Sequence, residues 1–175
     1  MIIVAIMGKS GSGKSTLEKA FEAFGFNRII SYTTRDIRDG EQNHREYHFV
    51  SREQFEGLIK SNILAEYAEY NGNFYGAPKP VGYERNVIVV ESDGLRKLKQ
   101  LYGDQVVGVY LDVDDDEIEN RLDKRNNTPD RESRKIEDER KFSDIEDLID
   151  IKLNGKAKSS CNIVEVTKII ASRGL

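Results

Sequence analysis

The sequence predicts an α/β domain in which a parallel sheet is flanked by helices. Short apolar runs lie at residues 2–7, 87–90, 106–111 and 148–153, and they are continuous rather than alternating. Such runs are typical of strands buried on both faces. Helical patterns separate these runs, and the first run leads directly into a glycine-rich octet. Alternating strands and helices build parallel sheets, whose ligands bind at the carboxyl ends of the strands.

The octet at residues 8–15 reads GKSGSGKS and fits the phosphate-loop pattern G-x-x-x-x-G-K-S/T. Its glycines let successive N–H groups turn toward phosphate oxygens, and the following helix adds its positive dipole end. A Gly/Ser-rich turn that only links strand to helix explains neither the lysine nor the spacing. We expect Lys14 to reach the β- and γ-phosphates of ATP and the Ser15 hydroxyl to coordinate Mg²⁺. The expected ATP contacts are Gly8, Ser10, Gly11, Ser12, Gly13, Lys14, Ser15 and Thr16.

Composition limits the kind of protein. The chain has 175 residues, enough for one domain, and its 33% charged residues are of mixed sign with a formal net charge of -4. This balance gives no general affinity for nucleic acid or for an anionic membrane. Cys161 is the only cysteine, and two histidines without cysteine partners argue against a zinc site. The apolar start is too short for a signal peptide, and no run reaches the ~18 residues of a membrane span. We expect a cytoplasmic monomer or homodimer whose partners are small molecules.

The remaining chain suggests a core with two interruptions. A fifth strand is expected at 28–31, and helices at 15–24, 93–101, 116–124 and 161–172. From about 31 to 79 the alternation breaks, and Ser51 begins a capping box, SREQ, that opens a helix. We interpret 31–79 as a lobe inserted into one domain, whose core comprises 1–30, 80–124 and 141–175. The almost wholly charged stretch 125–140 is interpreted as a lid, although a solvated helix face also explains it.

Two arginines in the inserted lobe predict a second phosphate site. Arg35 and Arg38 lie beside hydroxyl residues, and Tyr47 follows them. The planar guanidinium suits two-pronged contact with phosphate oxygens, and a tyrosine hydroxyl can donate to the same group. Spacing alone fits a surface salt-bridge cluster equally well.

An acidic residue follows the strand at 87–90. Glu91 should emerge at the carboxyl edge of the sheet beside the phosphate loop, where it can order water around Mg²⁺ or touch a bound base. Asp93 is the alternative, although Ser92 and Asp93 can instead cap the next helix. Strand register favours Glu91.

The segment that starts at Ser31 resembles the guanylate kinase family pattern S-x-T-T-R-x-x-R-x-G-E followed by Y-x-F-V. The resemblance continues through LAE at 64–66, GNFYG at 72–76, RLDKR at 121–125 and Asn154 at the end of a late strand. Together with the phosphate loop it covers nearly the whole chain, in the family's order and spacing.

This resemblance implies an ATP:GMP phosphotransferase. It assigns four residues to the phosphate of the accepting nucleotide: Arg35, Arg38, Tyr47 and Tyr75. It assigns Ser31 and Glu66 to guanine, with Glu91 close to the base. The chemistry agrees, because one carboxylate can accept from both N1–H and the N2 amino group of guanine, whereas adenine lacks that donor pair.

The family's lid supplies arginines that neutralise charge during phosphoryl transfer, together with Lys14, Arg35 and Arg38. Arg125 matches the first lid arginine. Arg131, Arg134 and Arg140 compete for the second, of which we favour Arg134; each can also be a helix-surface residue paired with a nearby acid.

Several residues depart from the family pattern. Ala77 replaces a usual Ser or Thr, His44 replaces a Gly, and Asn126-Asn127 replaces Gly-Thr. We expect phosphorylation of GMP, and of dGMP, by direct in-line transfer from ATP with Mg²⁺. The alternatives are a P-loop kinase of another nucleotide or small phosphorylated acceptor, and a non-catalytic guanylate-kinase-like binding module, against which the intact loop argues.

Overall fold

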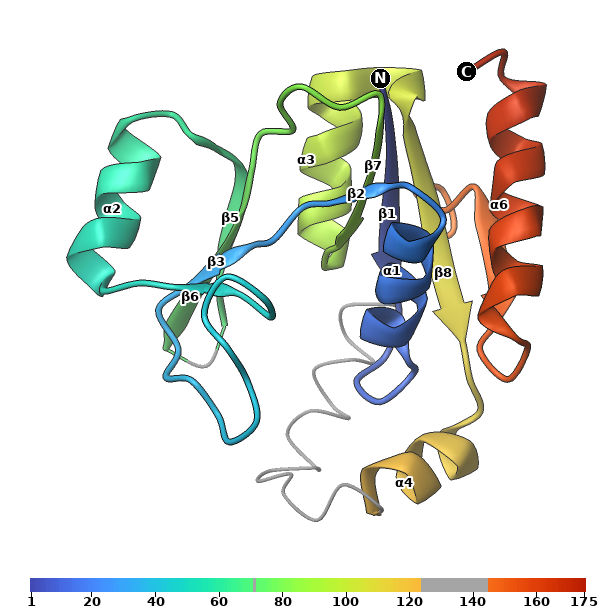
Figure 1. The fold of residues 1–175 in the computed structure, drawn as a ribbon, viewed down its shortest axis with the longest axis horizontal. Coiled ribbons are helices and arrows are strands. Elements are labelled where there is room, and N and C mark those ends of the chain that lie inside the picture. Colours follow the sequence, from blue (N-terminus) through green and yellow to red (C-terminus); the bar gives the residue numbers. More distant parts are fainter. Residues whose placement is uncertain (71, 124–144) are drawn as a thin grey trace.

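The computed structural model describes residues 1–70, 72–123 and 145–175. A five-stranded parallel sheet forms its core, in the order β2-β7-β1-β8-β9 (Figure 1). Its strands are β1 (Ile2–Met7), β2 (Asn27–Arg28), β7 (Arg85–Val89), β8 (Val106–Asp112) and β9 (Ile151–Asn154). The helices around it are α1 (Lys14–Ala23), α3 (Ser92–Tyr102), α4 (Asp115–Asp123) and α6 (Ser159–Ser172), with a 3₁₀ turn at Gly103–Gln105.

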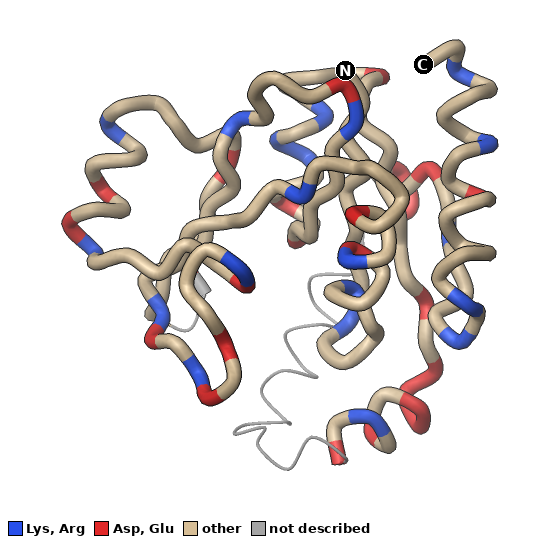
Figure 2. Tube along the Cα trace, viewed as in Figure 1, with Lys and Arg blue, Asp and Glu red and all other residues tan. Residues whose placement is uncertain are grey.

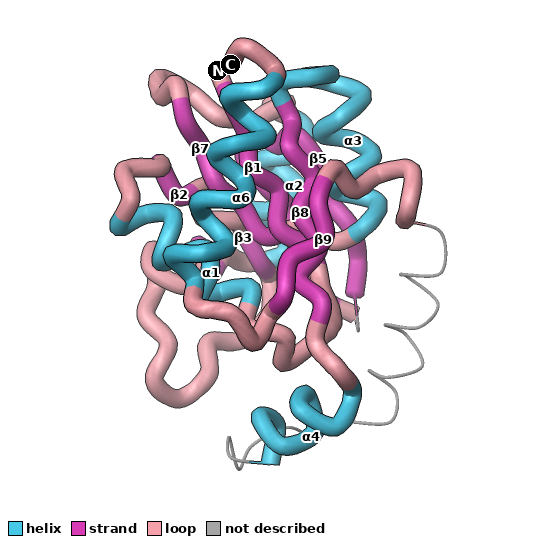
Figure 3. Tube along the Cα trace, turned by 90° about the vertical axis from the view of Figure 1, so that its right-hand side faces the viewer, coloured by secondary structure: helices cyan, strands magenta, loops and turns pink. Residues whose placement is uncertain are grey.

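The central strand β1 serves two apolar layers because its side chains point alternately to opposite faces. Ile2, Val4 and Ile6 pack with Leu17 and Phe21 of α1 and with apolar residues of α6. Ile3, Ala5 and Met7 pack with Leu95 and Leu98 of α3. The views in Figures 1 and 3 show α3 on the face of the sheet opposite to α1 and α6. Both faces are therefore covered, as the continuous apolar runs predicted.

A second sheet, which we call the lobe sheet, stands beside the core (Figure 1). Its order is β4-β3-β6-β5, from β3 (Tyr32–Thr33), β4 (His48–Phe49), β5 (Leu64–Tyr70) and β6 (Asn73–Pro78). Helix α2 (Arg52–Lys60) packs on it through the buried Phe55, whose ring stacks on Phe74 with centroids 5.4 Å apart. The predicted capping box is confirmed, since Ser51 Oγ accepts from Gln54 N–H (3.1 Å) and Ser51 N–H donates to Gln54 Oε1 (2.8 Å).

Several predicted boundaries were wrong; for example, β7 spans Arg85–Val89 instead of 87–90, and α6 begins at Ser159 instead of 161. Leu148 ends a turn closed by a hydrogen bond from its N–H to Ile145 O (2.8 Å), and β9 begins only at Ile151. The Asp150 carboxylate accepts a hydrogen bond from Gly108 N–H (2.6 Å) on β8. This side-chain contact keeps residues 148–150 from pairing as a strand there. Strand β2 ends at Arg28 instead of continuing to 31, although Ile29 N–H still donates to Val87 O (2.9 Å).

The start of α3 also differs from the prediction: the helix begins at Ser92 with Glu91 as its N-cap residue, so Ser92 and Asp93 do not cap it.

The parallel strands direct their carboxyl ends to one edge of the core. The phosphate loop after β1, the turn after β7 and helix α4 after β8 gather there (Figure 1). Basic and acidic residues are interspersed along the trace in Figure 2. No helix in the described ranges is long and apolar enough to span a membrane. The expected lid at 125–140 lies outside the described residues.

Candidate active site

The phosphate loop follows β1 in a conformation that requires glycine. Gly8 has φ 153° and Gly13 has φ 103°, both in the region that side chains disfavour. A Cβ on Gly8 would lie 2.7 Å from the carbonyl oxygen of Leu111. The backbone therefore turns tightly against β8, and α1 begins at Lys14. This places the N-terminal dipole of α1 at the loop.

Lys14 reaches back over the loop that precedes it. Its ammonium donates to the carbonyl oxygens of Gly8 (2.6 Å) and Lys9 (3.0 Å). Ser12 is buried inside the loop, and its hydroxyl has no hydrogen-bond partner among the described residues. A buried polar group without a partner costs about 1–3 kcal/mol, which a bound phosphate oxygen would recover. Ser15 and Thr16 are exposed in the first turn of α1.

Helix α4 clamps this loop through Arg121, a contact that sequence reasoning missed. Arg121 Nη1 donates to Ser12 O (2.9 Å) and Nη2 to Gly155 O (3.1 Å), while Nε pairs with Glu117 Oε1 (2.7 Å). The sequence did contain one signal for this contact. Glu117 and Arg121 are four residues apart, so on a helix they can pair and the ion pair orients the guanidinium. A single side chain thereby joins the phosphate loop to the segment after β9.

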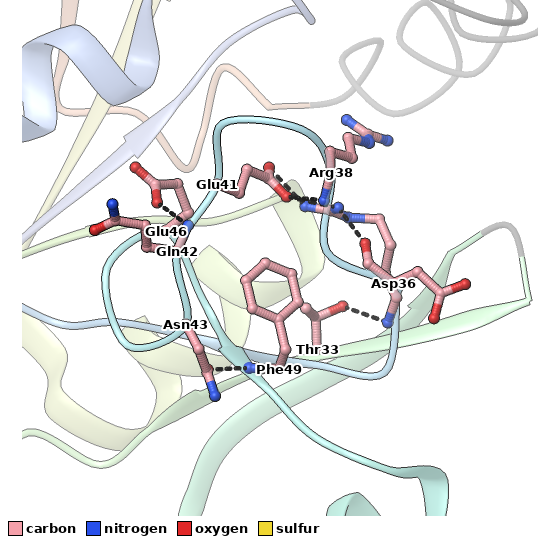
Figure 4. Close-up of polar contacts among 9 residues, drawn as sticks. Thr33, Asp36, Arg38, Glu41, Gln42, Asn43, Glu46 and Phe49 are labelled. Carbon is pink, nitrogen blue, oxygen red and sulfur yellow. Dashed lines mark hydrogen bonds and ion pairs between the residues drawn. The ribbon is translucent and has the colours of Figure 1, made fainter.

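The lobe contains a second set of charged groups around Glu41 (Figure 4). Arg35 makes a two-pronged ion pair with Glu41, at 2.9 and 3.0 Å, and donates to Asp36 O at 2.6 Å. Its side chain is only 11% exposed, and its guanidinium lies over the rings of Tyr47 (5.5 Å) and Phe49 (5.3 Å). The salt bridge that spacing alone allowed is therefore present in a half-buried position, and the contact of Arg35 with a phosphate stays a prediction.

Glu41 organises the turn that carries both arginines. It accepts from the backbone N–H of Arg38 (2.9 Å) as well as from Arg35. Burial opposes ionisation, but the hydrogen bonds from Arg35 and Arg38 outweigh it and lower the pKa of the Glu41 carboxyl. The Arg38 side chain is exposed and extends away from the Arg35–Glu41 pair in Figure 4.

Tyr47 lies beside Tyr75, with ring centroids 5.9 Å apart. Burial raises the pKa of the Tyr47 phenol to about 12. Its hydroxyl therefore stays protonated at neutral pH and remains a hydrogen-bond donor. The structure brings three of the expected phosphate contacts together: Arg35, Tyr47 and Tyr75.

Glu66 on β5 is partly buried against the first turn of α3. A Cβ on Gly94 would lie 3.0 Å from Glu66 Oε2. Burial raises the pKa of the Glu66 carboxyl to about 7; the N–H of Ala77 opposes this shift, and the charges of Glu91 and Asp93 add to it. The rival acids Glu91 and Asp93 thus both act on Glu66. Ser31 is half-buried between β2 and β3, and its carbonyl accepts from His48 N–H (2.9 Å).

Among the described residues, the expected site residues therefore lie in the phosphate loop and in the lobe, with Glu91 at the start of α3 in the core. Arg125 and Arg134, with their rivals Arg131 and Arg140, lie outside the described residues. Their roles, and the contacts expected with ATP and GMP, remain predictions.

A parallel sheet with a phosphate loop after its central strand, joined to an inserted lobe, is the architecture of a P-loop kinase. The family model named guanylate kinase matches residues 1–141. This chain belongs to the guanylate kinase family, whose members are nucleoside monophosphate kinases.

Relatives and solved structures agree with this assignment. The chain is 34% identical to a guanylate kinase of Lactobacillus johnsonii over 74% of this chain and 68% of the relative. It is 37% identical to one from Francisella tularensis subsp. holarctica, over 71% and 72%. The structure of a guanylate kinase from Anaplasma phagocytophilum has a TM-score of 0.75 at 21% identity, covering 98% of this chain and 85% of that one. A gluconokinase from Sinorhizobium meliloti 1021 has a TM-score of 0.54 at 16% identity, covering 98% and 92%, so the fold alone does not define the acceptor.

Proposed function

We propose that this protein transfers the γ-phosphoryl group of ATP to GMP, and to dGMP, by direct in-line displacement. The observation that carries the choice of guanine is Glu66, a partly buried carboxylate between the lobe and α3. Its two oxygens would accept from guanine N1–H and the N2 amino group, and the Ser31 hydroxyl would donate to O6. AMP would leave that carboxylate without its donors, which is a strong basis for rejection.

ATP would bind the loop from Gly8 to Thr16. Lys14 would donate to the β- and γ-phosphates, and the Ser12 hydroxyl would gain the partner that it lacks among the described residues. The exposed Ser15 hydroxyl suits Mg²⁺, which takes few protein oxygens when phosphates and water complete its octahedron. A Mg²⁺ ion held there by Ser15 would supply charge neutralisation to the transferring phosphate.

The phosphate of the acceptor would bind Arg35, Arg38, Tyr47 and Tyr75. Arg35 is already oriented by Glu41, and the neutral Tyr47 hydroxyl can donate without adding negative charge. The transition state would be stabilised by Lys14, Arg35 and Arg38, together with Arg125 and Arg134. No enzyme nucleophile is required.

Two alternatives remain to be tested against this proposal. Ala77 leaves the site without the usual hydroxyl, which favours a changed acceptor among other nucleotides or small phosphorylated compounds. A non-catalytic binding module is opposed by the retention of Gly8, Gly13, Lys14 and Ser15 in loop geometry.

The deciding experiment is a coupled ADP-release assay with ATP, Mg²⁺ and GMP, dGMP, AMP, CMP or UMP. Turnover confined to GMP and dGMP is expected. Turnover with another base would refute the role of Glu66, and absence of turnover with all five despite ATP binding would favour a different acceptor or a binding module.

A further inference from the structure

A pocket of about 620 Å³ lies between α3 and the lobe, beside the proposed acceptor site. Strand β5 is the outer strand of the lobe sheet, and α3 packs alongside it (Figure 1). Three residues spaced four apart on α3, Asp93, Lys97 and Leu101, line the pocket from the core side. The volume is in the range of about 300–1,000 Å³ that small-molecule sites occupy.

The chemistry of the pocket changes along its length. Glu66 and Asp93 make one part acidic, whereas Ile59, Leu64 and Leu101 supply apolar walls. Lys79 and Lys97 add two positive charges, and no carboxylate of the described residues pairs with either ammonium group.

Two wall residues also leave large apolar surfaces in contact with solvent. Tyr67 is 53% exposed and Leu101 is 48% exposed. A flat ring bound in the pocket would cover both side chains, and an acidic substituent on that ring would meet the two lysines. Apolar walls with a few converging polar groups are the usual composition of a ligand site.

We propose that this pocket binds a small aromatic anion, with its ring on Tyr67 and Leu101 and its acidic group between Lys79 and Lys97. The walls come from the core, through α3, and from the lobe, through α2, β5 and Lys79, which follows β6. A ligand here therefore contacts both parts at once and adjoins Glu66. A ligand bound in the pocket should therefore change KM for GMP. This effect on the enzyme reaction, unlike binding itself, rests on the proposed function.

The absence of tryptophan from the chain allows a specific test with 1-anilinonaphthalene-8-sulfonate (ANS) as the probe. Leu101→Trp places one tryptophan on the half-exposed pocket wall, where energy transfer to bound ANS reports occupancy. We expect saturable binding at one site. ANS fluorescence with the unmodified chain provides the same measurement without that substitution.

The matched variants remove two positive charges inside or outside the pocket. Lys79→Gln with Lys97→Gln should weaken ANS binding by about five- to tenfold, the scale of two partly exposed ion pairs. The control is Lys158→Gln with Lys168→Gln, two exposed lysines of the α6 region. Equal affinity in the two double variants would overturn the proposal.

Competition separates this pocket from the acceptor site. Saturating GMP should leave ANS bound, and bound ANS should shift KM for GMP while leaving KM for ATP unchanged. Displacement of ANS by GMP would overturn the proposal, because it would place the probe in the acceptor site. A chain that binds ANS as expected but phosphorylates no nucleotide would instead refute the proposed function.

Discussion

Glu66→Gln is the sharpest perturbation of the proposed acceptor site. The substitution keeps the volume of the side chain but replaces one acceptor oxygen with an NH₂ group that faces the donors of guanine. Leaving such groups unpaired costs about 1–3 kcal/mol, which corresponds to a loss of about five- to 150-fold in kcat/KM for GMP. The ATP side should change little, because the phosphate loop is on another part of the chain.

The assay is steady-state ADP release with GMP and ATP varied separately. Glu69→Gln is the matched control, since Glu69 is an exposed residue of the same strand. Equal losses for the two nucleotides, or equal effects of the two variants, would refute the assignment of Glu66 to guanine.

The raised pKa of Glu66 makes the same argument testable by pH. The carboxylate accepts guanine donors only when ionised, so kcat/KM for GMP should rise as pH increases through about 7.

The stability of the fold should respond to pH in the opposite direction. The folded chain keeps this proton up to about pH 7, whereas the unfolded chain releases it near 4.5, so the stability contribution of protonated Glu66 is lost across this window. Glu66→Gln should therefore be more stable than the unmodified chain above pH 7, a difference that thermal melts can measure; equal melting temperatures above pH 7 would show that folding does not raise the pKa of Glu66.

Three further substitutions address the other contacts. Lys14→Ala should reduce turnover by about 10²-fold or more through lost charge stabilisation while thermal melts stay unchanged, and retained activity would contradict the role of the loop. Arg121→Ala should raise KM for ATP by about tenfold, because it frees the carbonyls of Ser12 and Gly155, whereas an effect on GMP alone would contradict the clamp. Glu41→Gln should raise KM for GMP by about five- to tenfold as Arg35 loses its ionic partner; an unchanged KM in the same assay would show that Arg35 needs no such support.

Local patterns were sufficient for the elements that depend on neighbouring residues. The strand at Ile2–Met7 and the capping box at Ser51 follow from short runs of sequence, and the structure confirms both. The start of β9 was wrong because Asp150 binds Gly108, which is distant along the chain.

The site shows the same division between near and distant contacts. The motif located Arg35. Its ion pair with Glu41, and the contacts of its guanidinium with the rings of Tyr47 and Phe49, depend on how the turn at 35–41 folds over β4. The raised pKa of Glu66 depends on α3, which packs against β5 only in the folded chain. Sequence patterns therefore predicted which residues to examine, whereas their ionisation and partners required the structure.

The pairing of β1 also has a consequence for biosynthesis. Ile3 pairs with Asn86 on one side and with Val106 on the other, so neither neighbour of β1 exists when β1 leaves the ribosome. Until the chain has been extended past β8, an apolar strand with two open edges is exposed, and such a segment is prone to aggregate or to bind chaperones. Slow synthesis should therefore be more harmful before β8 is complete than after it, and the long separation of these contacts should make folding slow for a domain of this size.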